Sequence, residues 1–188
     1  MKTRVLPVRL PALRKIKKLT LLIIGGLCFG VSGFAETETT RKDFNTFAAA
    51  HLGLWAGEVA SVIGESVVGE KGDTETYYWE SQLANDGKLL IHKSTGPRGS
   101  STLMTYYDVV AKKIRVTGVS SSGLVNQHKI HREGEKWIRL THQTAPDGTI
   151  REFMSTITWS GNTITVVINR MKAESIVSTQ TNVWHRVE

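Results

Sequence analysis

Residues 124–171 read LVNQHKIHREGEKWIRLTHQTAPDGTIREFMSTITWSGNTITVVINRM, and this stretch decides the fold. It holds segments rich in Val, Ile, Thr and aromatic residues, in which apolar and polar side chains alternate with a period of two. That period is typical of β-strands with two different faces. The segments are joined by short links that contain Gly134, Gly148 and Gly161, and short links connect neighbouring antiparallel strands. The stretch therefore predicts consecutive strands linked by hairpins.

The same pattern continues on both sides and extends the prediction to a long series of strands. An open meander of this length would leave two unpaired edges, and closure into a barrel removes them. We therefore expect an all-β fold, a single up-and-down antiparallel β-barrel of about eight to ten strands with one short N-terminal helix. A two-sheet sandwich is the alternative, although its Greek-key crossovers need longer links. The expected strands are 54–63, 74–84, 88–94, 101–110, 113–120, 124–132, 136–144, 149–159, 163–171 and 176–187.

The short helix is expected over residues 43–52 (DFNTFAAAHL), ahead of the first strand. Asp43 is its expected N-cap, and Phe44 and Phe47 fall on one stripe that can pack against the barrel. The polar residues 36–42 (ETETTRK) are expected to form a flexible segment before it.

The net positive charge of the chain lies entirely in a leader. Residues 1–35 carry no acid, whereas the remaining residues balance 17 Lys plus Arg against 17 Asp plus Glu. An uncharged apolar run at 19–34, with small residues at Gly33 and Ala35, is typical of a secretory signal peptide cut after Ala35. The run is shorter than the roughly 20 residues that span a bilayer. We therefore expect an exported protein, periplasmic or extracellular, with a retained N-terminal anchor as the alternative.

The charge balance after residue 35 also bears on partners. It argues against a nucleic-acid-binding surface, and no stable membrane insertion is expected once the signal peptide is removed. Cys28 is the only cysteine and lies in the leader, so the mature chain has no thiol for disulfides, metal ligation or nucleophilic catalysis. The expected organisation is a signal peptide at 1–35, a flexible segment at 36–42 and a barrel domain at 43–188.

A short motif after the helix links the two ends of the predicted sheet. Residues 53–58 read GLWAGE, and the last strand ends in VWHRVE at 183–188. Gly53 followed by Trp55 resembles the opening of the calycin superfamily, and the chain looks most like bacterial secreted lipocalin-like domains of undefined function. The resemblance implies that Trp55 plugs one end of the barrel and that a basic side chain of the last strand packs over it. Arg186 is the expected partner, with Arg170 as the alternative, because a guanidinium gains cation–π energy over an indole.

The alternation predicts a lumen lined by apolar and aromatic side chains with a few polar groups. An interior of this composition is typical of a small-molecule site. The alternative is a packed core in which the polar groups satisfy one another or bind buried water. In the strand 136–144 the apolar face carries Ile138, Leu140 and His142, and this face is expected to point inward. The candidate lining residues are Tyr77, Trp79, Tyr107, Asn126, His128, His142 and Ser155.

The sequence points to ligand binding more than to catalysis. It contains no G-x-S-x-G, H-E-x-x-H or Walker-type motif, so no catalytic residue is proposed and no cofactor is predicted. A two-histidine pair formed by His128 and His142 would be a poor zinc site, so no metal is expected. The favoured function is an exported, non-enzymatic barrel that binds a small, largely apolar molecule. The alternatives are a filled, partner-binding envelope protein and a heme-binding barrel similar to nitrobindin, with His128 or His142 as the axial ligand.

Overall fold

The computed structural model describes residues 37–60 and 74–187. The predicted signal peptide at 1–35 and the predicted end of the first strand at 61–63 lie outside these residues. No helix in the described part of the chain is long and apolar enough to cross a membrane.

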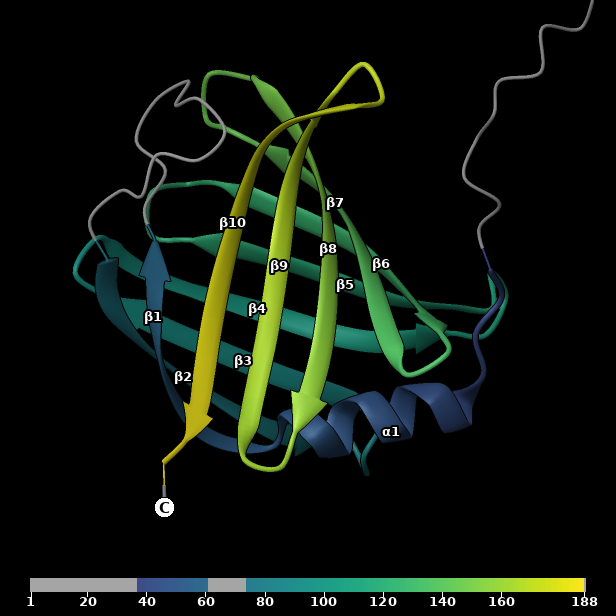
Figure 1. The fold of residues 1–188 in the computed structure, drawn as a ribbon. Coiled ribbons are helices and arrows are strands. Elements are labelled where there is room, and N and C mark those ends of the chain that lie inside the picture. Colours follow the sequence, from purple (N-terminus) through teal and green to yellow (C-terminus); the bar gives the residue numbers. More distant parts are fainter. Residues whose placement is uncertain (1–36, 61–73, 188) are drawn as a thin grey trace, which may run out of the picture. The chain divides into compact units, whose positions relative to one another are not determined.

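Ten antiparallel strands form a closed up-and-down barrel, which confirms the predicted fold (Figure 1). Each strand pairs with its neighbours in sequence, and the first strand pairs with the last. The predicted bounds of β2, β5 and β7 agree with the observed ones. The strands are β1 (Gly53–Ala60), β2 (Thr74–Ala84), β3 (Leu89–Gly96), β4 (Gly99–Asp108), β5 (Lys113–Ser120), β6 (Val125–Glu133), β7 (Lys136–Thr144), β8 (Ile150–Ser160), β9 (Thr163–Lys172) and β10 (Ser175–Arg186).

Helix α1 (Arg41–His51) lies across one end of the barrel (Figure 1). It begins two residues earlier than predicted, because Thr40 and not Asp43 is the N-cap. The Thr40 hydroxyl accepts a hydrogen bond from the Asp43 amide at 3.1 Å, and the Asp43 carboxylate accepts one from the Thr40 amide at 2.8 Å. This capping box satisfies two amides that a helix start leaves free. The apolar stripe of α1, including Phe44 and Phe47, is buried against the barrel.

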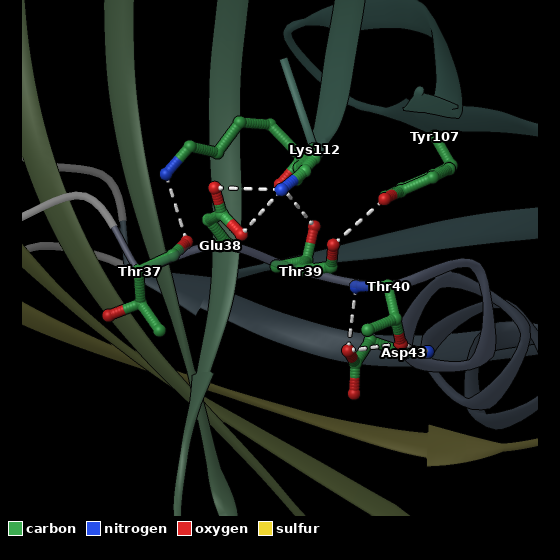
Figure 2. Close-up of polar contacts among 8 residues, drawn as sticks. Thr37, Glu38, Thr39, Thr40, Asp43, Tyr107 and Lys112 are labelled. Atoms are coloured by element: carbon green, nitrogen blue, oxygen red, sulfur yellow. Dashed lines mark hydrogen bonds and ion pairs between the residues drawn. The ribbon is translucent and has the colours of Figure 1, made fainter. Parts of the chain in front are cut away.

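Part of the segment that is predicted to be flexible, residues 37–40, contacts the β4–β5 turn, and residues 41–42 belong to α1 (Figure 2). Thr39 is buried, and its amide donates to the carbonyl of Lys112 at 2.8 Å. The hydroxyl of Tyr107 donates to the carbonyl of Thr39 at 2.9 Å. Lys112 also pairs with the carboxylate of Glu38 at 3.1 Å (Figure 2). These contacts explain why a polar sequence holds one conformation here.

An aromatic cluster seals the end of the barrel that α1 covers. Trp55 is fully buried, and Trp79 stacks on Trp184 with ring centres 4.3 Å apart. Phe47 of α1 packs edge-on against Trp137 at 5.2 Å, so the helix is part of the seal. We call this cluster the aromatic floor. Its members are Phe47, His51, Trp55, Trp79, Trp137, Trp159 and Trp184.

Candidate functional site in the barrel lumen

The lumen above the aromatic floor is built in levels by the strand register. Residues directly opposite each other in neighbouring strands point to the same face of a sheet. Arg139 pairs with Ser155, Ser155 with Ile168, and Ile168 with Gln180, so these four inward residues form one level around the barrel. We call it the arginine level. It lies further from the floor than the level of Trp137, Ile157 and Val166.

Between the floor and the arginine level lies an inner cavity of about 70 Å³. Its wall is mostly apolar, and the polar groups in it are a threonine, three histidines and one arginine. A cavity of this volume can take a small apolar group rather than a whole drug-sized ligand. The lining residues are Phe47, His51, Trp79, Leu90, His92, Leu103, Thr105, Val116, His128, Ile130, Arg139, Ile157 and Val166.

A second, outer cavity of about 280 Å³ opens above the first one. Leu103, His128 and Arg139 line both cavities, so the two meet at these side chains. The outer wall is much more polar, with amide and hydroxyl groups from five strands. The remaining lining residues are Ser101, Asn126, Thr141, Gln143, Phe153, Ser155, Ile168 and Gln180.

Among the described residues, Arg139 is the one charged side chain that lines both cavities, and no carboxylate of these residues lines either cavity. Its Nη2 donates to the hydroxyl of Ser155 at 3.2 Å, and its buried Nε has no hydrogen-bond partner among the described residues. Burial lowers the pKa of Arg139 to about 10, which still leaves the guanidinium charged at neutral pH. The side chain as a whole is half-buried, and a cation that is partly removed from water without a counter-ion is costly for a fold. The site is therefore chemically suited to an anionic group.

The three histidines of the inner cavity are held in the neutral form. Burial lowers the pKa of His51 to about 4, and it lowers the pKa values of His92 and His128 to about 3. The charge of Arg139 adds to the effect in all three. Near neutral pH, Arg139 is therefore the only cation among the described side chains of the inner cavity.

Each of these rings also has a fixed contact on one nitrogen. His51 Nδ1 donates to the carbonyl of Phe47 at 2.8 Å, His92 Nδ1 bonds the hydroxyl of Ser81 at 3.0 Å, and His128 Nδ1 bonds that of Thr141 at 2.7 Å. Because a neutral imidazole carries one N–H, the Nε2 of His51 is an acceptor.

The structure brings several predicted lining residues to the lumen. Trp79, Asn126, His128 and Ser155 line the inner or the outer cavity. Tyr77 is also on the inner face, where its ring packs against Gly96 so closely that an added Cβ would lie 2.3 Å from the ring atoms. Tyr107 has a different role, because its hydroxyl donates a hydrogen bond to the carbonyl of Thr39.

The prediction for His142 is wrong, because the inner face of β7 is the opposite one. His142 lies outside the barrel with a 56% exposed side chain, and its Nδ1 is 3.3 Å from Glu152. Ile138 and Leu140 share this outer face. The hairpin register explains the difference: His128 pairs with Thr141, and the inward face of β6 is continued by Thr141 and Arg139.

Arg139 is a lumen-lining residue that the hydrophobic pattern missed. The short link between β6 and β7 indicates which face of β7 points inward, because it sets the register of the two strands. The short turn pairs Glu133 with Lys136, which places Ile130 opposite Arg139. Ile130 lies two residues after His128, which is predicted to point inward, so it shares the inward face, and its partner Arg139 must point inward as well.

Metal and heme fit the lumen poorly. Among the described residues, no group of three or more His, Cys, Asp or Glu is placed to hold a metal ion. Of the two expected heme ligands, His142 is outside, and His128 faces cavities of about 70 and 280 Å³. A heme macrocycle is far larger than the inner cavity and would require the polar wall of the outer one to move.

Comparison with protein-family models finds no match for this chain, and comparison with curated proteins finds none either.

Proposed function

We propose that this protein is an exported, non-enzymatic binding barrel whose lumen takes a small molecule with an apolar part and one anionic group. The anionic group binds at Arg139, and the apolar part fills the inner cavity toward the aromatic floor. This keeps the small, largely apolar ligand that the sequence predicts and adds a charged end to it.

The observation that carries the proposal is the state of Arg139. Its Nε is buried without a hydrogen-bond partner, and no carboxylate lines the cavities around it, as far as the described residues go. A carboxylate or a similar anion supplies two acceptors to a guanidinium in a bidentate pair. Such a ligand would satisfy the orphaned Nε and neutralise the buried charge in one step.

The wall on either side of Arg139 supports an amphipathic ligand. Apolar residues such as Leu90, Val116 and Ile157 surround the inner cavity. Asn126, Gln143 and other amide or hydroxyl groups line the outer one. Burial of apolar surface gives affinity, whereas a few placed polar groups fix the orientation. The presence of two cavities in the described barrel also favours binding over a fully packed structural barrel.

The hydrogen bonds in the lumen favour binding over catalysis. The hydroxyl of Ser155 contacts Arg139, and the Nδ1 atoms of His51 and His128 are engaged by Phe47 and Thr141. None of these contacts forms the hydroxyl–imidazole–carboxylate series of a nucleophilic site. We also propose membership of the calycin superfamily, on the basis of the short helix, Gly53, Trp55 and Arg186.

The proposal is tested on protein purified from its own host without refolding. Native mass spectrometry should detect a bound small molecule, and solvent extraction should release a compound that ionises in negative mode. The same preparation of an Arg139→Met variant should carry little or none of it, because methionine keeps the length of the side chain and removes the charge.

Lys93→Met serves as the matched control, since Lys93 is an exposed cation on β3. It should retain the compound at the level of the unchanged protein. Recovery of a neutral compound, of equal amounts from the Arg139→Met variant, or of no compound from either protein would contradict the proposal.

A further inference from the structure

The β9–β10 turn lies at the end of the barrel away from α1 (Figure 1), and residues on both sides of this turn line a third cavity. Its volume is about 380 Å³. Three cations, Arg151, Arg170 and Lys172, line it together with apolar side chains such as Ile150 and Met171, and its lining includes no acid from the described residues. We call it the mouth cavity.

The mouth cavity lies next to the outer cavity, and its inward residues are two positions further along the same strands. Directly above the arginine level, Phe153 pairs with Arg170, and Arg170 pairs with Ser178. Phe153 lines the outer cavity, whereas Arg170 and Ser178 line the mouth cavity. Two residues along a strand and two strands across separate Arg139 from Arg170, which places their Cα atoms roughly 12 Å apart.

Several described acids near the mouth are engaged by other groups. Glu75 is paired with Arg98 at 2.9 Å, and Glu152 lies on the outer face beside His142. Asp147 accepts the amide of Thr149 at 2.8 Å and is the one nearby carboxylate whose low pKa includes a contribution from Arg151. No ion pair of Arg170 or Lys172 is formed among the described residues, so the positive potential there faces the cavity.

We propose that the mouth cavity is a second anion-binding site, and that the ligand of the barrel is a dianion with an apolar chain between its two charged ends. One end binds at Arg139, and the other binds at Arg170 with Arg151 and Lys172 around it. This inference rests on the proposed function, because it assigns a second charged group to the ligand of the same lumen.

The chemistry is that of a linear α,ω-dicarboxylate. A chain that reaches from Arg139 to Arg170 passes Phe153 and Ile168, which offer apolar contact between the two charged ends. A monoanion of the same length fills the same space but leaves one of the two cationic sites without a partner.

The test compares azelate with nonanoate, which have the same chain length and differ in the number of carboxylates. Isothermal titration of the full protein should give an affinity for azelate about tenfold higher than for nonanoate, and added salt should reduce the difference. In Arg170→Gln the preference should fall to less than about twofold, because that substitution removes the central cation of the mouth cavity. Lys93→Gln on the outer face should keep the full preference.

The outcomes separate this inference from the proposed function. Equal affinity of the unchanged protein for the two compounds would overturn the second site and leave a monoanion-binding lumen. A preference that survives in Arg170→Gln would also overturn it. Failure of both compounds to bind, with the protein folded, would overturn the inference together with the proposed function.

Discussion

The guanidinium carbon of Arg186 lies 4.4 Å from the centre of the Trp55 ring, and the two residues are direct partners in the β1–β10 ladder. Arg186 also donates from Nη1 to the carbonyl of Leu52, at the end of α1. One side chain therefore joins the last strand, the first strand and the helix. Gly53 makes room for it, since its φ is +99° and an added Cβ would lie 2.9 Å from Nη1 of Arg186.

Replacing Arg186 should therefore weaken the closure of the barrel. Arg186→Met removes a cation–π contact and a charged hydrogen bond, and we expect a loss of about 2 kcal/mol in the free energy of unfolding. Urea titration followed by tryptophan fluorescence measures it. Arg186→Lys keeps a cation near Trp55 and should lose less. If Arg186→Met unfolds at the same urea concentration as the unchanged protein, the closure does not depend on this contact.

Removing the buried charge of Arg139 should stabilise the protein when no ligand is bound. Arg139→Met replaces an uncompensated cation by an apolar side chain of similar length, and we expect a gain of about 1–2 kcal/mol in the free energy of unfolding. For a domain of this size the midpoint of thermal unfolding should rise by about 2–6 °C. Calorimetry on delipidated protein measures the shift. A lower midpoint would mean that Arg139 is there for stability rather than for a ligand.

Stability should fall as the pH drops below about 6.5, the pKa of a histidine in the unfolded chain. Burial lowers the pKa of His128 to about 3 and that of His51 to about 4. As the pH falls below about 6.5, these histidines therefore bind protons in the unfolded chain while they stay neutral in the native state. The stabilisation is complete above about pH 7 and is lost progressively toward pH 4, at up to about 1.4 kcal/mol per pH unit for each histidine.

The measurement is the free energy of unfolding in urea at several pH values between about 7.5 and 5. His128→Gln keeps a neutral polar side chain next to Thr141. In this variant the number of protons taken up on unfolding, which is the slope of stability against pH, should be smaller by about one. His185→Gln, at an exposed position of β10, should retain the slope of the unchanged protein. Identical slopes in all three proteins would show that His128 is not neutral in the fold for the reason given.

The segment at residues 37–40 should loosen when Tyr107 loses its hydroxyl. Tyr107→Phe removes the hydrogen bond to the carbonyl of Thr39, and the Thr39 amide should exchange with solvent about fivefold faster because the segment opens more often. Tyr106→Phe is the matched control, since Tyr106 is on the same strand with its side chain exposed. Equal exchange rates of the Thr39 amide in the two variants would contradict this assignment.

The strand order was readable from the sequence because the turns leave little choice. Links such as residues 134–135 and 161–162 are too short for anything except antiparallel neighbours. The contact between Trp55 and Arg186 was predictable as well, because a meander can close only by pairing its first and last strands. The start of α1 was missed, because Thr40 and Asp43 are both acceptable N-caps and only the capping box between them decides which is used.

The candidate site was harder to predict, because its main residue breaks the hydrophobic pattern. On β7 the alternation shows Ile138 and Leu140 on one face, and the opposite face carries Arg139. A rule that places apolar residues inside selects the wrong face where a charged side chain points into the lumen, as Arg139 does. The register set by the β6–β7 turn predicts the inward position of Arg139. The volume of the lumen depends on how the side chains pack, so the sequence does not predict it.

The most direct test of the account is the binding of nonanoate to the unchanged protein and to Arg139→Met, measured by isothermal titration at about pH 7 on delipidated samples. We expect a single site in the unchanged protein and an affinity at least about tenfold lower in Arg139→Met, although the variant is folded and at least as stable. Equal binding to the two proteins, or no binding to the unchanged one, would contradict the claim that Arg139 holds the anionic group of a ligand in the lumen.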